Sequence, residues 1–332
     1  MKNIKDRVIN SKKLFTNIFL CKITPDEIEQ ILVEQSKGGE EVYEILGAIF
    51  TLRDFMLKIN LGKELLDTCG TGGDGLGTFN ISTLTAIVLA GAGIKVAKHG
   101  NRKATGSFGS ADVLEKLGVN ICLTPHDAKK VFDEVGIIFL FAPIYHPIMK
   151  KVAPIRSKIG TRTIFNLIGP FCNPAQTENQ MIGVPNMSLL KKLTEVSLKL
   201  NFKRLALLSN PDGLDEVSIV SPTTVNIIRG KSYRTISIEP KRYGMNYSSF
   251  DGVKATDQIS NTKIFYEVLN GQVGARRDIV LLNVSLGLHL LEKAKDLEEG
   301  IEIAKRIIDS GVALQTFKKF ISISNKYGKI TF

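Results

Sequence analysis

The sequence is poor in cysteine and lacks the cysteine pairs that bind zinc. Its four cysteines are Cys21, Cys69, Cys122 and Cys172, and no two of them form a C-x-x-C pair. This spacing indicates neither a zinc site nor a framework of disulfides. Thiols scattered in this way are typical of a protein kept reduced in the cytosol, so we expect a cytoplasmic protein.

The sequence also lacks an apolar run of about 18 residues, the length that a membrane-spanning helix needs. Its longest apolar stretches, Leu84 to Ile94 and Val135 to Tyr145, have the length of buried helices or strands. Residues 1–22 are basic and then apolar, like a weak signal peptide, but Asn17 interrupts the apolar part and no small-residue cleavage site follows. We therefore expect an amphipathic first helix and no association with a membrane.

Acidic residues are outnumbered by basic ones. Lys and Arg number 44 and Asp and Glu 33, which gives a net charge of +11 at pH 7. Positive charge of this size favours anionic partners and leaves both a nucleic acid and a multiply phosphorylated substrate open. The basic residues are spread along the chain, as on a solvated surface. With 332 residues, of which 43% are hydrophobic, the chain is long enough for about two globular domains.

Strand and helix patterns alternate along the middle of the chain, which favours an α/β fold with a mainly parallel central sheet flanked by helices. Residues 1–60 read as helices, with Thr24 and Pro25 at the start of one of them. We expect a small N-terminal helical domain, to which a later segment returns, and a larger α/β domain. The helical domain takes residues 1–62 and about 146–180, and the α/β domain takes residues 63–145 and 181–332.

The apolar runs and turn formers also predict individual elements. The expected strands lie at residues 65–69, 95–98, 137–142 and 204–209. Residues 146–160 read as one helix and residues 161–175 as a segment of turns. From residue 256 onward the chain reads as helical, apart from its very end.

The strongest local motif is CGTGGDGLGTFNIST, at residues 69–83, between an expected strand and an expected helix. Five of the residues between 70 and 77 are glycines. Glycines allow positive φ angles and let backbone N–H groups converge on an anion. The following helix start adds its own free N–H groups and dipole. The motif therefore predicts a phosphate or pyrophosphate site, with Asn80, Ser82 and Thr83 as side-chain donors.

Neither common nucleotide-binding motif fits this segment. Gly70, Gly72 and Gly75 match G-x-G-x-x-G, but the next expected strand ends in Lys98 and His99. A dinucleotide site needs an acidic residue there to bind the ribose. The G-K-S at residues 230–232 lacks the first glycine of a P-loop, because Val225 stands in its place. A purely structural glycine turn is the alternative.

A basic loop follows the next expected strand, in KHGNRKATGSFGSADVLEKLG at residues 98–118. Lys98, Arg102 and Lys103 offer cations, and Ser110 is placed to cap the helix that follows. A lone basic loop is usually a solvated surface. Because this one follows a strand beside the glycine-rich loop, we expect it to form the other wall of the anion site.

A pair of acidic residues stands in a third loop, DGLDE at residues 212–216. Asp215 and Glu216 follow the expected strand at 204–209 and can present oxygens to a hard cation. Magnesium bound to substrate phosphates takes only one or two protein carboxylates. On its own such a pair favours a solvated turn, but beside a pyrophosphate site it predicts a magnesium site.

Together these segments resemble the anthranilate phosphoribosyltransferase family. The resemblance covers nearly the whole chain in order and is weakest over residues 1–60 and 229–255. The matching motifs are GTGGDG at 70–75, NIST at 80–83, KHGNR at 98–102, GSADVLE at 109–115, HPIMKKVAPIRSKIGTRTIFNLIGP at 146–170, DE at 215–216, RRDIVLLN at 276–283, DLEEGIEIA at 296–304 and IDSGVA at 308–313.

The resemblance implies a reaction of tryptophan biosynthesis. In it the amine of anthranilate displaces pyrophosphate from 5-phosphoribosyl 1-diphosphate (PRPP), with Mg²⁺ as cofactor. The resemblance also implies an active site in the cleft between the helical and α/β domains, and a homodimer formed through the helical domain. An aromatic amine is nucleophilic enough to need no strong general base, so none is expected among the residues of the site.

The positions of the motifs assign residues to each ligand by resemblance. The PRPP contacts are Gly70, Gly73, Asp74, Thr78, Asn80, Ile81, Ser82, Thr83, Lys98, Thr105, Gly106 and Ser110. The anthranilate contacts are Gly70, Asn101, Arg156, His99 and His146, and the magnesium ligands are Ser82, Asp215 and Glu216. Arg156 is the expected partner of the anthranilate carboxylate, because its planar fork matches that group. A satisfied, non-catalytic role stays open for both histidines.

Two other functions stay open beside this one. A pyrimidine nucleoside phosphorylase-like enzyme shares the fold and the glycine-rich phosphate site, but the KHGNR segment and Arg156 favour anthranilate. A non-catalytic, nucleic-acid-binding relative would use the net positive charge on a contiguous basic face. Such a protein would need neither the acidic pair nor Ser82, so their presence favours the enzyme.

Overall fold

The N-terminal helices begin and end where the sequence places capping residues. In the computed structural model, which describes residues 3–72, 75–102 and 108–330, they are α1 (Ile4–Phe19), α2 (Pro25–Gly38) and α3 (Val42–Phe55). Thr24 caps α2: its hydroxyl accepts a hydrogen bond from Glu27 N, and the Glu27 carboxylate accepts one from Thr24 N at 2.8 Å. The expected helical start of the chain is confirmed.

A seven-stranded sheet forms the centre of the molecule, in the order β3-β2-β1-β4-β5-β6-β7. The first five strands in this order are parallel to one another, whereas β6 pairs antiparallel with both β5 and β7. This confirms the expected α/β fold with a mainly parallel sheet. The strands are β1 (Leu66–Gly70), β2 (Val96–Gly100), β3 (Ile137–Phe141), β4 (Asn179–Gly183), β5 (Arg204–Ser209), β6 (Thr223–Arg229) and β7 (Ser232–Ile238).

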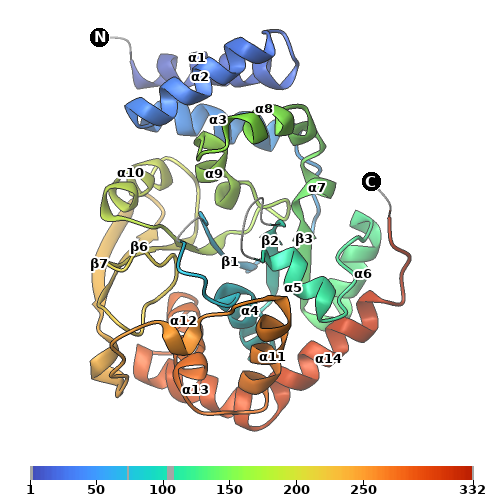
Figure 1. Ribbon diagram of the computed structural model, residues 1–332, viewed down its shortest axis with the longest axis vertical. Coiled ribbons are helices and arrows are strands. Elements are labelled where there is room, and N and C mark those ends of the chain that lie inside the picture. The colour runs from blue at the N-terminus through green and yellow to red at the C-terminus, as the bar shows by residue number, and fades with distance from the viewer. Residues whose placement is uncertain (1–2, 73–74, 103–107, 331–332) are drawn as a thin grey trace.

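Helices cover both faces of this sheet. Helix α4 (Ile81–Gly91) packs on β1 and β2, with α12 (Ala275–Leu290) and α14 (Val312–Ser324) behind it. Helix α10 (Met187–Ser197) packs on β5 from the other side, next to α3. In Figure 1, α1–α3 and α8 therefore lie at one end of the molecule and α11–α14 at the other. The remaining α-helices are α5 (Ser110–Lys116), α6 (Pro125–Val135), α7 (Ala142–Tyr145), α8 (Ala153–Ile159), α9 (Ile164–Ile168), α11 (Gln258–Leu269) and α13 (Leu297–Asp309).

Two expectations for residues 146–175 were wrong. The single helix expected over 146–160 is a 3₁₀ helix, Pro147–Lys151, followed by α8. Pro154 stands in the first turn of α8, where it cannot donate a hydrogen bond back into the preceding turn, so the helix starts anew. The segment of turns expected over 161–175 contains α9 and the 3₁₀ helix Gly169–Cys172.

Two apolar clusters make up the core. One lies around α4 and the C-terminal helices. The other joins Phe15 of α1 and Ile49 of α3 to Phe165 of α9, and also contains Leu190 of α10 and Leu207 of β5. The return of the chain after residue 146 thus packs on the N-terminal helices. Because the second cluster takes residues from both of the expected domains, the division at residues 62, 146 and 180 stays a proposal.

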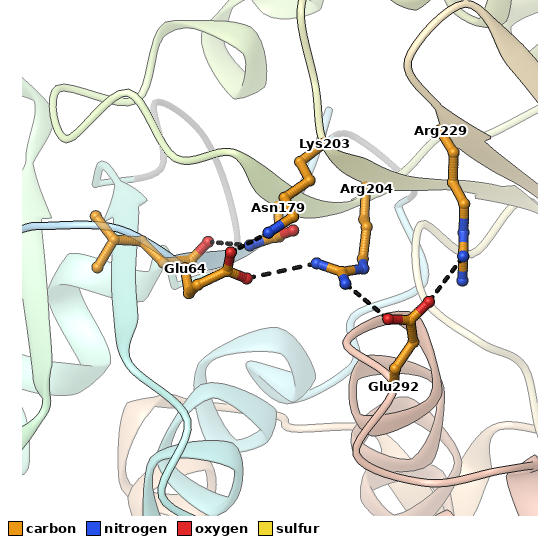
Figure 2. A network of polar contacts seen from close by, with 7 residues as sticks. Glu64, Asn179, Lys203, Arg204, Arg229 and Glu292 are labelled. Atoms are coloured by element: carbon orange, nitrogen blue, oxygen red, sulfur yellow. Dashed lines mark hydrogen bonds and ion pairs between the residues drawn. The ribbon is translucent and has the colours of Figure 1, made fainter.

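A polar network ties together the amino ends of the parallel strands, away from the loops of interest (Figure 2). Glu64, just before β1, pairs with Lys203 and with Arg204 at the start of β5. Glu292 pairs with Arg204 at 2.8 Å and with Arg229 of β6 at 2.7 Å. Three of the basic residues that contribute to the positive net charge are therefore paired with carboxylates of the chain itself.

Across the described ranges, we find no helix that is long and apolar enough to cross a membrane.

Candidate active site

The strand order reverses between β1 and β4, and this is where the predicted site residues gather. The chain leaves β1 toward β2 and β3 on one side, while β4 and β5 continue the sheet on the other. A crevice forms at the carboxyl ends of strands at such a switch point, and ligands bind there. Strands β1, β2 and β4 end in Gly70, Gly100 and Gly183, with Gly70 paired to Gly183 in register.

Asp215 lies directly on the two paired glycines. Its Oδ2 accepts a hydrogen bond from Gly72 N at 2.9 Å. A Cβ added at Gly70 would stand 2.6 Å from Asp215 Cγ, and one added at Gly183 would stand 2.8 Å from Asp215 Cα. Only glycine at both strand ends lets the loop with the acidic pair approach this closely. Gly70 was predicted from the sequence, and Gly183 was missed.

Glu216 meets the start of α4 beside Lys98. Its Oε1 accepts a hydrogen bond from Ser82 N at 3.0 Å. The Lys98 ammonium donates to Ser82 Oγ at 3.2 Å and to the Thr68 carbonyl. Burial and the neighbouring Asp215 carboxylate raise the pKa of Glu216 to about 8, although Lys98 and the hydrogen bond from Ser82 act in the opposite direction. Ser82, Asp215 and Glu216, the three predicted magnesium ligands, are thus brought together.

This donor set fits a magnesium ion that is shared with substrate phosphates. Two adjacent, half-buried carboxylates oppose each other's ionisation, and a divalent cation relieves that repulsion. In the part of the chain that the structure describes, no group of three or more His, Cys, Asp or Glu side chains could hold a metal by itself. Two carboxylates and one hydroxyl leave coordination positions for phosphate oxygens and water, as magnesium prefers.

Two asparagines that the sequence analysis missed hold the acidic loop. Asn210 donates to the Glu216 carbonyl at 2.9 Å. Asn283 of α12, which is fully buried, accepts from Val217 N at 3.0 Å and donates to the Val217 carbonyl. Asn283 is the last residue of the RRDIVLLN motif found in the sequence. Its contact with Val217, which lies 66 residues earlier, was not predicted.

The end of the glycine-rich loop is held by Asn80. Its side chain donates to the Phe108 carbonyl at 3.1 Å and accepts from Asn261 of α11 at 2.7 Å. Thr78 forms an isolated bridge to Lys254. The side chains of Ile81 and Thr83 are buried, each about 1% exposed. Of the predicted PRPP contacts in this segment, these two therefore do not present their side chains to solvent.

The basic loop differs from its prediction in two ways. Arg102 is not a free cation, because it pairs with Asp112 at 3.0 Å and with Glu115. Ser110 is not the cap of α5: Gly109 is, and Ser110 is the first helical residue, with its hydroxyl donating to the Asn101 carbonyl at 3.5 Å. The predicted contacts Gly73, Asp74, Thr105 and Gly106, and Lys103 of the same loop, lie outside the described residues.

A cavity of about 370 Å³ opens beside this site, between the strand ends and the segment that returns to the N-terminal helices. Its lining includes every residue that the resemblance assigned to anthranilate: Gly70, His99, Asn101, His146 and Arg156. Much of the remaining lining is apolar, with Leu52, Met149 and Phe165 among it. Because Gly70 also touches Asp215, the cavity and the acidic pair share one wall.

The rings of the two histidines in the cavity wall lie close together, with centroids 5.0 Å apart and planes tilted by 54°. Burial lowers the pKa of His146 to about 4, and burial together with the neighbouring His146 ring lowers that of His99 well below its usual value. Both rings are therefore neutral at pH 7. His99 Nε2 and both ring nitrogens of His146 are buried without a hydrogen-bond partner in the described parts of the chain.

Arg156 supplies a cation to the same cavity. Its guanidinium lies over the Phe165 ring, 5.6 Å from the centroid, and burial lowers its pKa. No hydrogen bond or ion pair reaches the guanidinium from any described residue. An unpaired, partly desolvated guanidinium in a mostly apolar cavity favours a carboxylate ligand, which it can bind with two parallel hydrogen bonds.

The sequence analysis missed a buried carboxylate beneath the cavity. Asp67 of β1 is fully buried, and it accepts hydrogen bonds from His99 N, Asn173 Nδ2 and Gln180 Nε2. A single Asp within an apolar strand carries no motif, and its partners are distant in sequence. No signal in the sequence alone could have found this cluster.

Comparison with known proteins agrees with this geometry. Residues 62–314 match the family described as "Glycosyl transferase family, a/b domain". The chain thus belongs to this class of glycosyl transferases. A curated relative from Desulfitobacterium hafniense is 44% identical over 298 residues, which are 90% of this chain and 89% of the relative. One from Caldanaerobacter subterraneus is 42% identical over 304 residues, 91% of this chain and 90% of the relative. Both are named anthranilate phosphoribosyltransferase, and the chain belongs to that family.

Solved structures extend the similarity to the whole fold. The anthranilate phosphoribosyltransferase of Thermus thermophilus matches with a TM-score of 0.88 and 30% identity, over 98% of this chain and all of that one (100%). The enzyme of Saccharomyces cerevisiae, solved in complex with PRPP and Mg, matches with a TM-score of 0.86 and 25% identity, over 98% of this chain and 94% of that one. The same yeast enzyme is also known with 4-fluoroanthranilate.

Proposed function

We propose that this chain transfers the phosphoribosyl group of PRPP to the amine of anthranilate and releases pyrophosphate, with Mg²⁺ as cofactor, in tryptophan biosynthesis. One observation carries the proposal: the cavity lined by Arg156, whose guanidinium has no partner among the described residues, meets the half-buried acidic pair at Gly70. A carboxylate-bearing aromatic molecule in the cavity and a magnesium-bound diphosphate at the strand ends would lie next to each other. Membership of the family supports the same reaction.

The roles of the individual residues follow from their surroundings. Arg156 binds the carboxylate of anthranilate and so turns the ortho amine toward Gly70. Ser82, Asp215 and Glu216 hold Mg²⁺, which when bound neutralises charge on the departing pyrophosphate. Lys98, buried beneath the start of α4, adds a fixed positive charge at the same place. Preorganised charge of this kind stabilises the leaving group without moving at the moment of reaction.

The cavity also suits the nucleophile. Because His99 and His146 are neutral, they add no positive charge to that of Arg156, and each ring can accept a proton of the amine through one of its nitrogens. An aromatic amine needs no stronger base, so orientation and proximity carry most of the rate. Contacts of Thr78, Asn80 and Ser110 with PRPP would come beside the contacts that each of these residues already makes within the protein.

A homodimer through the N-terminal helices and a cytoplasmic location complete the proposal. Helix α1 exposes Ile4 and Ile9, with exposed fractions of 44% and 51%, and exposed apolar side chains on one helix favour burial against a second copy. Sedimentation of the purified protein at micromolar concentration tests the dimer. A monomer would refute it, and Ile9→Glu should dissociate a dimer that uses this helix.

The reaction is tested by following the fluorescence of anthranilate. Purified protein should consume the fluorescence only when PRPP and Mg²⁺ are both present, with pyrophosphate formed in equal amount. The double variant Asp215→Asn, Glu216→Gln should need far more Mg²⁺ for the same rate, because the ion loses both of its carboxylates. No loss of fluorescence with the folded protein would refute the transferase, and an unchanged magnesium titration would remove the acidic pair from the metal site.

A further inference from the structure

Asp67 joins three segments that are far apart in the sequence. Its Oδ1 accepts a hydrogen bond from His99 N of β2 at 3.1 Å. Its Oδ2 accepts one from Asn173 Nδ2 at 2.7 Å and one from Gln180 Nε2 of β4 at 3.3 Å. Burial raises the pKa of Asp67 to about 6, while Lys98 and these three hydrogen bonds favour the charged form. A fully buried carboxylate is costly, and so many partners indicate that it has a defined task.

The partners of Asp67 hold two parts of the cavity wall. His99, Gly100 and Asn101 form one wall, and Gly169, Pro170 and Cys172 belong to the other. Asp67 fixes the first wall directly through His99 N. It fixes the second through its two side-chain partners.

Each of these partners also holds the chain around the second wall. Gln180 Nε2 donates to the Pro170 carbonyl at 2.9 Å. Asn173 donates to the Ala97 carbonyl at 2.7 Å, and its Oδ1 accepts from Ala175 N at 2.8 Å. Asp67 itself is not among the residues that line the cavity.

We propose that Asp67 is a positioning residue that sets the distance between the His99 wall and the Gly169–Cys172 wall, and thereby the fit of the aromatic substrate. The inference rests on the proposed function, since it names anthranilate as the molecule that the cavity fits. Asp67 contacts no substrate in this scheme and acts only through the two walls. Its removal should therefore affect the binding of anthranilate more than that of PRPP.

The carboxylate cannot be replaced by the amide of the same shape. Both oxygens of Asp67 face N–H donors, with the Asn173 and Gln180 amides on one side and His99 N on the other. An asparagine at position 67 must turn its NH₂ toward one of these sides, where donor meets donor. A buried donor that faces another donor destabilises the folded arrangement, so we expect one of the walls to move.

The experiment compares KM for anthranilate and KM for PRPP in the wild type and in Asp67→Asn. We expect KM for anthranilate to rise roughly tenfold, the equivalent of one such mismatch, and KM for PRPP to change by less than about twofold. A role in stability alone would lower the melting temperature of Asp67→Asn without separating the two KM values.

A matched control exists far from the cavity. Asn120 is also buried, and its side chain donates to the carbonyls of Ser324 and Tyr327 at 3.3 and 3.0 Å. Asn120→Asp creates a comparable mismatch there and should lower the melting temperature while leaving both KM values unchanged.

Two results would overturn the proposal: equal changes in both KM values, or no change in either. If Asp67→Asn does not fold, Asn173→Ala, which releases only the second wall, must give the same separation of KM values. An inactive wild type would refute the proposed function instead, so the two failures are distinguishable.

Discussion

Replacement of Gly183 by alanine should displace the acidic loop and weaken the use of PRPP. The new Cβ would stand 2.8 Å from Asp215 Cα, with the carbonyl carbon and oxygen of Asp215 closer still. Ordinary contacts begin at 3.4 Å, so the backbone of the loop must move by about 1 Å or more. The loop is held by Asn210 and Asn283, so it cannot move without also breaking their hydrogen bonds.

The size of the effect follows from this displacement. A shift of about 1 Å in a positioning group costs roughly 100-fold in rate, or about 2.7 kcal/mol of transition-state stabilisation. We therefore expect kcat/KM for PRPP to fall roughly 100-fold in Gly183→Ala. The Mg²⁺ concentration needed for half-maximal rate should rise, because Asp215 and Glu216 no longer converge with Ser82.

The assay is the decrease in anthranilate fluorescence over a matrix of PRPP and Mg²⁺ concentrations. Gly38→Ala is the matched control, since nothing lies within 4 Å of a Cβ at that position and its φ is not in the left-handed region. The control should keep wild-type kinetics. Wild-type kcat/KM and magnesium dependence in Gly183→Ala would refute the reasoning, because they would mean that the acidic loop need not lie against the strand end.

Three further predictions concern charge. Arg156→Ala should raise KM for anthranilate roughly 100-fold, because two charge-assisted hydrogen bonds are lost, and Arg156→Lys should have an intermediate effect. Steady-state kinetics should show KM for PRPP nearly unchanged. Equal increases in both KM values would contradict the assignment of Arg156 to anthranilate. Glu292→Ala removes the partner of Arg204 and Arg229 and should lower the melting temperature by a few degrees in dilute buffer. In about 1 M salt, which screens these ion pairs, the variant and the wild type should melt at nearly the same temperature. The steady-state kinetics of the variant should be those of the wild type. Because the folded pKa of Asp67 is raised from 3.8 to about 6, the protonated form is favoured by folding, and stability falls as pH rises through this range. The free energy of unfolding of the wild type, measured with urea relative to Asp67→Asn, should therefore fall by about 2 kcal/mol between pH 4 and pH 6.5, and a flat difference would contradict the raised pKa.

The parallel part of the fold could be predicted because it depends on local signals. Buried parallel strands read as apolar runs, as in Ile137–Phe141, and helix starts carry capping residues such as Thr124, whose hydroxyl accepts from Asp127 N at 3.1 Å. Strand β4 was missed because it begins with Asn179 and Gln180. Their side chains find partners more than 100 residues away: Asn179 donates to the carbonyl of Leu65, just before β1, and Gln180 donates to Asp67 of β1. The β6–β7 hairpin was missed, since the last strand expected from the sequence was that at residues 204–209.

The site shows the same division between local and distant causes. Glycine-rich and acidic loops could be located from the sequence, because backbone freedom and charge are properties of the residues themselves. Which groups meet could not be predicted: Asp112 and Glu115 neutralise Arg102, and Asp215 rests on Gly183. Such pairings depend on the register of the sheet, where Gly70 and Gly183 end side by side. Whether the proposed ligands bind these residues stays a prediction.

The apolar cluster that joins the N-terminal helices to α10 and β5 determines whether the chain can be shortened at residue 63. Because Phe15 and Ile49 share one core with Leu190 and Leu207, the first helices and the sheet should melt in a single cooperative transition rather than as separable modules. A truncated chain that starts at residue 63 would expose the apolar side of α10 and β5 to water and would aggregate rather than act as a minimal catalyst. Recombination between relatives should accordingly tolerate crossovers poorly at this boundary, even though it looks like a linker in the sequence.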